Sequence, residues 1–310
     1  MWQPFYGSLK NERFLKKTGV KFMRDSTKAV IKKFNIKLTK SLGQNFLTDD
    51  NIIRKIVDAA DVGNRDFVIE VGPGIGSMTR ELAKRAGQVT TVEIDRHLIP
   101  ALSEELKEFS NVTIINKDIM KVDFDEIFGN ISGEAKTFDS VKVVANLPYY
   151  ITTPIIMRFL EENPGIDTLV FMVQKEVAER MAAKPGGKDY GALSVAVQYY
   201  SRPERVFDVP PHCFIPQPEV DSTVIRLKVL QKPEIELTNK DIFFKTVKAS
   251  FGQRRKTLLN ALSNSQYFTE SKEQIREILN NLGIDENIRG ESLTIVQFAQ
   301  IANSFSIKNS

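Results

Sequence analysis

The sequence contains very little cysteine and histidine and no long apolar run. Its single cysteine, Cys213, excludes an internal disulfide framework and is typical of a reducing compartment. The two histidines, His97 and His212, have no Cys or His neighbours at ligand spacing, so we expect no metal site. No stretch approaches the roughly 18 uninterrupted apolar residues of a membrane span, and the N-terminus lacks the apolar segment of a secretory signal. We therefore expect a cytoplasmic protein that binds neither membrane nor metal.

The charge of the chain is unevenly distributed. Residues 1–40 carry eleven Lys or Arg and two acidic residues, although the net charge of all 310 residues is only +4. A basic N-terminal arm over residues 1–39, attached to a mildly acidic body, suggests a polyanionic partner. The alternative is a solvated, disordered tail.

Alternating strand and helix patterns follow the arm and predict an α/β domain, over residues 40–230, with a largely parallel sheet. Asp49 or Asp50 is expected to cap the first helix, over residues 52–60. Strands are expected at Phe67–Val71, Val89–Glu93, Val112–Ile115, Val141–Ala145, Thr168–Val173, Arg205–Val209 and Ser222–Lys228. Helices are expected at Ser77–Arg85, Leu98–Glu108, Thr153–Leu160, Lys175–Ala183 and Leu193–Tyr199.

The alternation ends near Leu230, and helical periodicity alone continues. It predicts a small all-α domain over residues 231–310, with helices at Lys240–Ser250, Arg254–Ser263, Lys272–Asn281 and Ser292–Ala302. Residues 242–269 contain no acid but five cationic side chains: Lys245, Lys248, Arg254, Arg255 and Lys256. Such a face can hold RNA phosphates and set the register of binding, and the alternative is an ordinary helix surface.

A glycine-rich turn follows the first strand, in the sequence Glu70-Val71-Gly72-Pro73-Gly74-Ile75-Gly76. Its spacing differs from the G-x-G-x-x-G of dinucleotide sites, and Glu70 would repel a pyrophosphate. Glu93 ends the next strand, where a carboxylate can accept hydrogen bonds from both ribose hydroxyls of an adenosine, and Asp118 is placed to meet an adenine amine. Together they predict a nucleoside site without phosphate binding, which fits S-adenosylmethionine, although each feature alone is equally typical of a tight turn or a solvated strand end.

The segment Asn146-Leu147-Pro148-Tyr149 ends the predicted fourth strand. The Asn146 side-chain carbonyl and the Leu147 backbone carbonyl can accept both hydrogens of an exocyclic amine, Pro148 fixes the turn, and the Tyr149 ring can stack on a base. These groups suit chemistry on the amino group of a nucleobase. The alternative is a strand that runs into a proline turn, with core aromatics, and we expect Tyr150 in the core.

Several ordered motifs resemble those of the ribosomal RNA adenine dimethyltransferases, and most closely the small-subunit branch called kasugamycin-sensitivity dimethyltransferases. They include Ser41-Leu42-Gly43-Gln44-Asn45-Phe46-Leu47, the glycine-rich turn, Asn146–Tyr149 and Phe214-Ile215-Pro216-Gln217-Pro218-Glu219-Val220-Asp221-Ser222. The resemblance implies a Rossmann-like class I methyltransferase sheet. It also implies S-adenosylmethionine contacts from Asn45, Leu47, Gly72, Glu93, Asp118 and Asn146, and a second stacking residue in Phe214. The implied reaction is dimethylation of two adjacent adenosines in a hairpin loop near the 3′ end of 16S rRNA, within the pre-30S subunit, and we expect a monomer.

Three alternatives remain open at this point. The sister class that methylates 23S rRNA is disfavoured by Gln253–Thr257 and by the long Pro210–Ser222 segment. DNA adenine methyltransferases carry Pro where this chain has Leu147. A ribosome-assembly or transcription factor that has lost transfer activity is disfavoured by the intact Asn146 and Tyr149.

Overall fold

The computed structural model describes residues 27–36, 43–128, 138–162 and 165–308. Most of the predicted basic arm therefore lies outside the described residues, apart from helix α1 (Thr27–Lys33) and the turn that follows it. Within the described ranges, no helix is long and apolar enough to cross a membrane. No group of three or more His, Cys, Asp or Glu side chains in these ranges is arranged to hold a metal ion.

A seven-stranded sheet forms the centre of the molecule, in the order β4-β3-β2-β5-β6-β9-β7. The first five strands in this order are parallel, and β9 runs antiparallel to both β6 and β7. The largely parallel sheet is thus confirmed. The strands are β2 (Asp66–Val71), β3 (Gln88–Val92), β4 (Val112–Ile115), β5 (Ser140–Asn146), β6 (Thr168–Gln174), β7 (Ser201–Val209) and β9 (Ser222–Val229).

Helices cover both faces of the sheet, which explains why β2 is buried along its whole length. Val68 and Val144 pack with α2 and α3 on one face, whereas Ile69 and Val143 pack with α6 on the other. Asp49 caps α2, as expected, because its side chain accepts hydrogen bonds from two backbone amides of the first turn. The helices are α2 (Asp50–Ala59), α3 (Ser77–Ala83), α4 (Ile99–Leu106), α5 (Phe124–Phe128), α6 (Thr152–Glu162), α7 (Lys175–Ala182) and α8 (Ala192–Tyr200).

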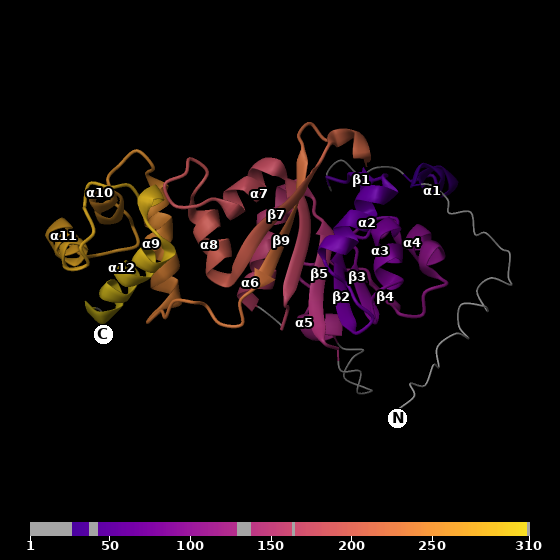
Figure 1. The fold of residues 1–310 in the computed structure, drawn as a ribbon, viewed down its shortest axis with the longest axis horizontal. Helices are drawn as coiled ribbons and strands as arrows, with labels where there is room; N and C mark the ends of the chain where they lie inside the picture. The colour runs from indigo at the N-terminus through magenta and orange to yellow at the C-terminus, as the bar shows by residue number, and fades with distance from the viewer. Residues whose placement is uncertain (1–26, 37–42, 129–137, 163–164, 309–310) are drawn as a thin grey trace, which may run out of the picture.

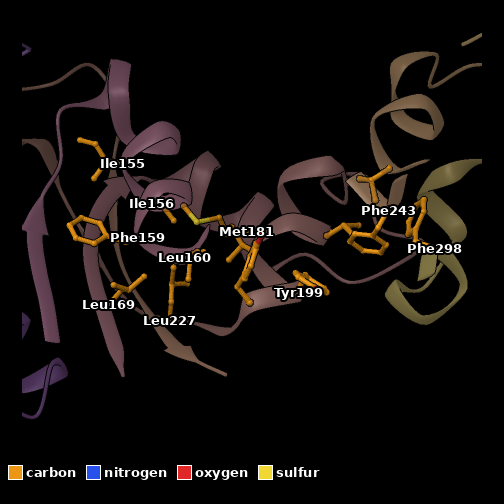
Figure 2. Packing of buried hydrophobic residues seen from close by; sticks show 14 of the residues in the cluster. Ile155, Ile156, Phe159, Leu160, Leu169, Met181, Tyr199, Leu227, Phe243 and Phe298 are labelled. Carbon is orange, nitrogen blue, oxygen red and sulfur yellow. The ribbon is translucent and has the colours of Figure 1, made fainter. Parts of the chain in front are cut away.

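Four helices at one end of the elongated molecule form the C-terminal part (Figure 1). They are α9 (Lys240–Gly252), α10 (Leu258–Ser263), α11 (Lys272–Asn281) and α12 (Ile295–Lys308). Their apolar side chains belong to the same buried cluster as the α6 side of the sheet. Figure 2 shows this continuity, which runs from Ile155 of α6 through Tyr199 of α8 to Phe243 of α9 and Phe298 of α12.

Several predicted boundaries differ from those in the structure. The helix expected from Arg254 begins at Leu258, because Thr257 caps it by accepting a hydrogen bond from the Asn260 amide. The helix expected from Ser292 begins at Ile295, after a capping exchange between Thr294 and Gln297. Strand β7 begins four residues earlier than expected, at Ser201.

Two short strands were not predicted, and they form a separate two-stranded sheet. Strand β1 (Phe46–Leu47) pairs antiparallel with β8 (Phe214–Ile215), so that Leu47 lies opposite Phe214. Two-residue strands are too short to show a period in the sequence. Their pairing joins the segment before α2 to the segment before β9, across roughly half of the chain.

Candidate active site

A cleft of about 900 Å³, including the part open to solvent, lies at the carboxyl ends of β2, β3 and β5. This is the edge at which ligands bind in open α/β sheets. Eight of the ten predicted catalytic and cofactor-binding residues line it: Asn45, Leu47, Gly72, Glu93, Asn146, Leu147, Pro148 and Tyr149. The other two, Asp118 and Phe214, do not.

The glycine-rich turn forms the floor of the cleft. Gly72, Gly74 and Gly76 have φ angles of 66°, 59° and 81°, a left-handed conformation that favours glycine. A Cβ atom at Gly74 would also lie 2.7 Å from the Phe46 ring. At Gly72 a Cβ atom would meet no protein atom within 4 Å. The turn therefore leaves room above Gly72 for a ligand.

Glu93 is oriented by the backbone around it. Its carboxylate accepts hydrogen bonds from the Gly74 amide at 3.1 Å and the Asp95 amide at 2.8 Å, and only 4% of the residue is exposed. Burial raises the pKa of Glu93 to about 7, although these two hydrogen bonds act to lower it. Since each carboxylate oxygen has a further lone pair, Glu93 keeps the capacity to accept two ribose hydroxyls.

Glu70 lies on the neighbouring strand and is fully buried. Neither of its carboxyl oxygens has a hydrogen-bond partner among the described residues. Burial, against the opposing effect of the nearby Thr79 hydroxyl and helped by the negative charge of Glu93, raises the pKa of Glu70 to about 8. The side chain is therefore largely protonated at neutral pH, and it adds little negative charge beneath the cleft.

The side-chain amide of Asn146 is fixed in one orientation. Its Nδ2 donates a hydrogen bond of 2.9 Å to the backbone carbonyl of Asn45, and only the nitrogen end of an amide can do this. The carbonyl end of Asn146 is thereby left to accept. The Pro148 carbonyl already accepts from the Ile151 amide and the Thr152 hydroxyl, which leaves the Leu147 carbonyl as the candidate for a second acceptor.

Tyr149 and Tyr150 form a short 3₁₀ turn with Ile151 directly after Pro148. The half-buried Tyr149 ring lines the cleft, and its hydroxyl lies 2.7 Å from the hydroxyl of Ser222 on β9. Burial raises the pKa of the Tyr149 phenol, which stays protonated at neutral pH. The expectation that Tyr150 lies in the core is wrong, because this residue is 60% exposed at the edge of the cleft.

Asp118 and Phe214 lie outside the cleft lining. Asp118 accepts a hydrogen bond from the Met120 amide and so stabilises the turn after β4. Phe214 is 1% exposed and packs in the core beneath β1. In this conformation the Phe214 ring has no face open to a base, because β8 holds it against Leu47.

The cleft fits S-adenosylmethionine in its donor set and its walls. Glu93 is available for ribose hydroxyls, and Ile94 and Leu98 offer apolar walls for a planar ring. The carboxylate of Glu93 disfavours a phosphate-bearing ligand but tolerates a cation. Asn45, Leu47, Gly72, Glu93 and Asn146 would hold the cofactor.

Three supporting residues were not predicted from the sequence. Gln44 donates a hydrogen bond of 2.8 Å to Asp95, whose amide binds Glu93, so the pair braces one wall of the cleft. Ser222 contacts Tyr149 from a strand 73 residues away in the chain. Gln44 and Asp95 lie next to predicted site residues, and Ser222 ends the motif that begins at Phe214, but nothing in the sequence pairs Ser222 with Tyr149.

The five cationic residues predicted to bind RNA are not equivalent. Lys245 pairs with Asp241 at 2.6 Å. Arg254 pairs with Glu291 at 3.3 Å and donates to the Lys188 carbonyl, so it links the helices to the loop before α8. The remaining three are exposed and have no ion pair within the described part of the chain: Lys248, Arg255 and Lys256.

The chain is similar to proteins of one family over most of its length. Residues 35–306 match the family described as ribosomal RNA adenine dimethylase. Ribosomal RNA small subunit methyltransferase A of Clostridioides difficile is 54% identical over 92% of this chain and 96% of its own length. The Bacillus mycoides protein of the same name is 50% identical over 90% and 94%.

Solved structures agree with this assignment. A dimethyladenosine transferase from Plasmodium falciparum has a TM-score of 0.71 at 26% identity, and covers 85% of this chain and 98% of its own. The 23S rRNA methyltransferase ErmE has a TM-score of 0.62 at 26% identity, over 84% and 99%. The sequence match spans the sheet and the C-terminal helices alike, so the chain belongs to the ribosomal RNA adenine dimethylase family.

Proposed function

We propose that this protein transfers methyl groups from S-adenosylmethionine to the exocyclic amines of two adjacent adenosines near the 3′ end of 16S rRNA, during assembly of the small ribosomal subunit. The observation that carries the proposal is the fixed carboxamide of Asn146, whose carbonyl is left to accept beside the Tyr149 ring and the Glu93 carboxylate. We further propose that it acts as a monomer in the cytoplasm, where ribosomal subunits are assembled.

An adenine amine is a poor nucleophile because its lone pair is delocalised into the ring. Acceptance of its two hydrogens by the Asn146 side-chain carbonyl and the Leu147 backbone carbonyl favours a pyramidal nitrogen with a localised lone pair. Tyr149 stacks on the base, which contributes roughly 1–3 kcal/mol. S-adenosylmethionine supplies an electrophilic methyl group when it is bound. The alkylated nitrogen is acidic enough to lose its proton to water, so no strong base is required.

The target adenosines must leave their stack to enter the cleft. Contacts from Lys248, Arg255 and Lys256 to phosphates would hold the RNA in register. In this scheme Lys245 and Arg254 have mainly intramolecular roles, because each already has a carboxylate partner. Asp118, which lies outside the cleft lining, remains a candidate for the adenine amine of the cofactor. Phe214 remains a candidate for a second stacking residue and would have to move from its buried position.

The likeness to ErmE makes 23S rRNA the competing substrate. We favour the small subunit because relatives named for it share half or more of their residues with this chain along nearly its entire length. The test is transfer of labelled methyl groups from S-adenosylmethionine to undermethylated small subunits, with large subunits and 23S rRNA as parallel acceptors. We expect label in 16S rRNA alone, and none with Asn146→Ala. Label in 23S rRNA, or in neither acceptor, would reject the proposal.

A further inference from the structure

Ser222 is the first residue of β9 and is completely buried. Its hydroxyl lies 2.7 Å from that of Tyr149, a distance typical of a well-formed O–H···O hydrogen bond. Because the Tyr149 phenol is protonated at neutral pH, it has a proton to share in this bond. The interaction joins the stacking ring to a strand far away in the sequence.

The position of Ser222 is fixed by the sheet on both sides. It lies opposite Gln174 of β6 and opposite Val209 of β7. Strand β6 also supports the other half of the site, since Met172 lies opposite Asn146 and its carbonyl accepts from the Leu147 amide. Met172 and Gln174 are two residues apart, so they point to the same face of β6. Strand β6 therefore positions both Asn146, which would bind the amine, and Ser222, which contacts the Tyr149 ring.

We propose that Ser222 is a positioning residue for methyl transfer, which holds the hydroxyl end of the Tyr149 ring and so restricts the orientation of the stacked target base. This inference rests on the proposed function and deepens it. Without this bond the direction of the ring axis would depend on packing alone, and the Tyr149 ring is only half-buried. When Ser222 holds its hydroxyl, the ring axis has a single direction. Catalysis depends on the alignment of the target base, which stacks on this ring.

The second methylation depends on this anchor more than the first. The unmodified amine offers two hydrogens to the two acceptors, whereas the monomethylated amine offers only one. Base orientation in the second step therefore relies more on the stacked ring. Loss of the anchor is expected to lower the overall rate and also to release a larger fraction of monomethylated adenosine.

The experiment compares Ser222→Ala, Tyr149→Phe and the double variant on undermethylated small subunits. Each single change removes one hydroxyl and keeps the ring. We expect each to lower kcat about fivefold, the value of one hydrogen bond, with a higher ratio of monomethyl to dimethyl product and an unchanged Kd for S-adenosylmethionine. The double variant should be no slower than either single variant.

Thr223→Val is the matched control. Thr223 is the next residue on β9, is equally buried, and bonds to Asp208 at 2.7 Å on the opposite face of the strand. We expect this variant to lose stability but to keep the wild-type product ratio. The positioning role would be overturned if the double variant lowered kcat by the product of the two single effects. A wild-type product ratio in Ser222→Ala would overturn it as well.

A second readout separates this proposal from the proposed function. An RNA hairpin with 2-aminopurine at the target adenosine loses fluorescence when that base stacks, and it can be measured with S-adenosylhomocysteine bound. We expect weaker quenching with Ser222→Ala than with wild type. If the wild-type protein transfers no methyl group, the proposed function fails, and equal quenching in this assay would reject the role of Ser222 independently.

Discussion

At the scale of single residues, the site is defined by two buried carboxyls with different surroundings. Glu93 accepts two backbone hydrogen bonds, whereas Glu70 has none among the described residues. Burial raises the pKa of both, to about 7 and about 8 respectively. Each carboxyl is therefore protonated over part of the physiological range, and ligand binding and stability should both respond to pH.

The affinity for S-adenosylmethionine should rise with pH through about 7. Only the carboxylate form of Glu93 accepts hydrogen bonds from both ribose hydroxyls, and its pKa in the free protein is about 7. We expect the Kd to be up to about tenfold weaker at pH 6 than at pH 8, since the ionised fraction changes by that factor. Isothermal titration calorimetry measures it. Glu93→Gln should bind weakly with a flat profile, and a profile as steep as that of wild type would contradict the assignment.

Glu70 should make the folded protein less stable as pH rises. Its folded pKa of about 8 exceeds the ordinary value of 4.5, so between these values the folded state binds a proton that the unfolded state has lost. The free energy of unfolding from this group then falls with increasing pH, by up to about 1.4 kcal/mol per pH unit. Urea unfolding at pH 5.5, 6.5 and 7.5 tests this. Glu70→Gln should make the slope less steep without abolishing it, because the raised pKa of Glu93 contributes with the same sign below about pH 7. Parallel profiles would exclude Glu70 as a source of the slope.

At the scale of elements, α1 forms part of the support of the cofactor cleft. Val30 is fully buried in a cluster with Phe46, Ile75 and Leu98. These three residues also line the cleft. The Thr27 hydroxyl lies 3.4 Å from the Leu47 carbonyl and 3.3 Å from the Ser77 hydroxyl. Although α1 belongs to the basic arm in sequence, its buried face therefore packs against β1 and the glycine-rich turn.

Disruption of α1 should weaken cofactor binding. Thr27→Val keeps the shape of the side chain and removes both hydroxyl contacts, and we expect the Kd for S-adenosylmethionine to rise about fivefold. Val30→Asp buries a carboxylate and should have a larger effect. Lys32→Ala changes an exposed residue of the same helix and serves as the control. Wild-type affinity in Val30→Asp, with the fold intact by circular dichroism, would show that α1 does not support the cleft.

RNA affinity should depend on the exposed cations near the end of α9. Combined Lys248→Ala, Arg255→Ala and Lys256→Ala should reduce the slope of log K against log salt concentration by about 2–3, because each phosphate contact contributes about 0.7–0.9. Filter binding over a salt series measures this. Arg254→Ala is the comparison, since that side chain already bonds to Glu291 and Lys188. An unchanged slope in the triple variant would place the RNA elsewhere.

At the scale of the whole molecule, sequence patterns predicted the sheet better than the contacts between distant segments. The apolar strands and the glycine-rich turn are local signals, and they located Glu93 and Asn146 at one sheet edge. The pairing of Phe46–Leu47 with Phe214–Ile215 and the bond from Ser222 to Tyr149 depend on tertiary packing. No period or cap in the sequence records such contacts. The buried position of Phe214 follows from this pairing, which explains why its motif alone suggested an open ring.

The sheet and the C-terminal helices share one apolar core, which bears on the predicted boundary near residue 230. Phe243 of α9 is fully buried, and its ring centre lies 5.2 Å from that of Tyr199 on α8. The same buried cluster extends from Phe243 to Phe298 of α12 (Figure 2). Each part thus completes the packing of the other, and we expect them to unfold as one cooperative unit.

Phe243→Ala should therefore destabilise the whole protein, by about 3–5 kcal/mol as for other buried Phe-to-Ala changes. Hydrogen exchange in mild urea, read by mass spectrometry, reports separately on β5 and on α11. We expect both to lose protection at the same, lower urea concentration. Val296→Ala changes a residue of α12 that is 52% exposed and should alter stability by less than about 0.5 kcal/mol. If α11 loses protection while β5 keeps it, the helices form a separate unit, and the boundary near residue 230 separates two independently stable domains.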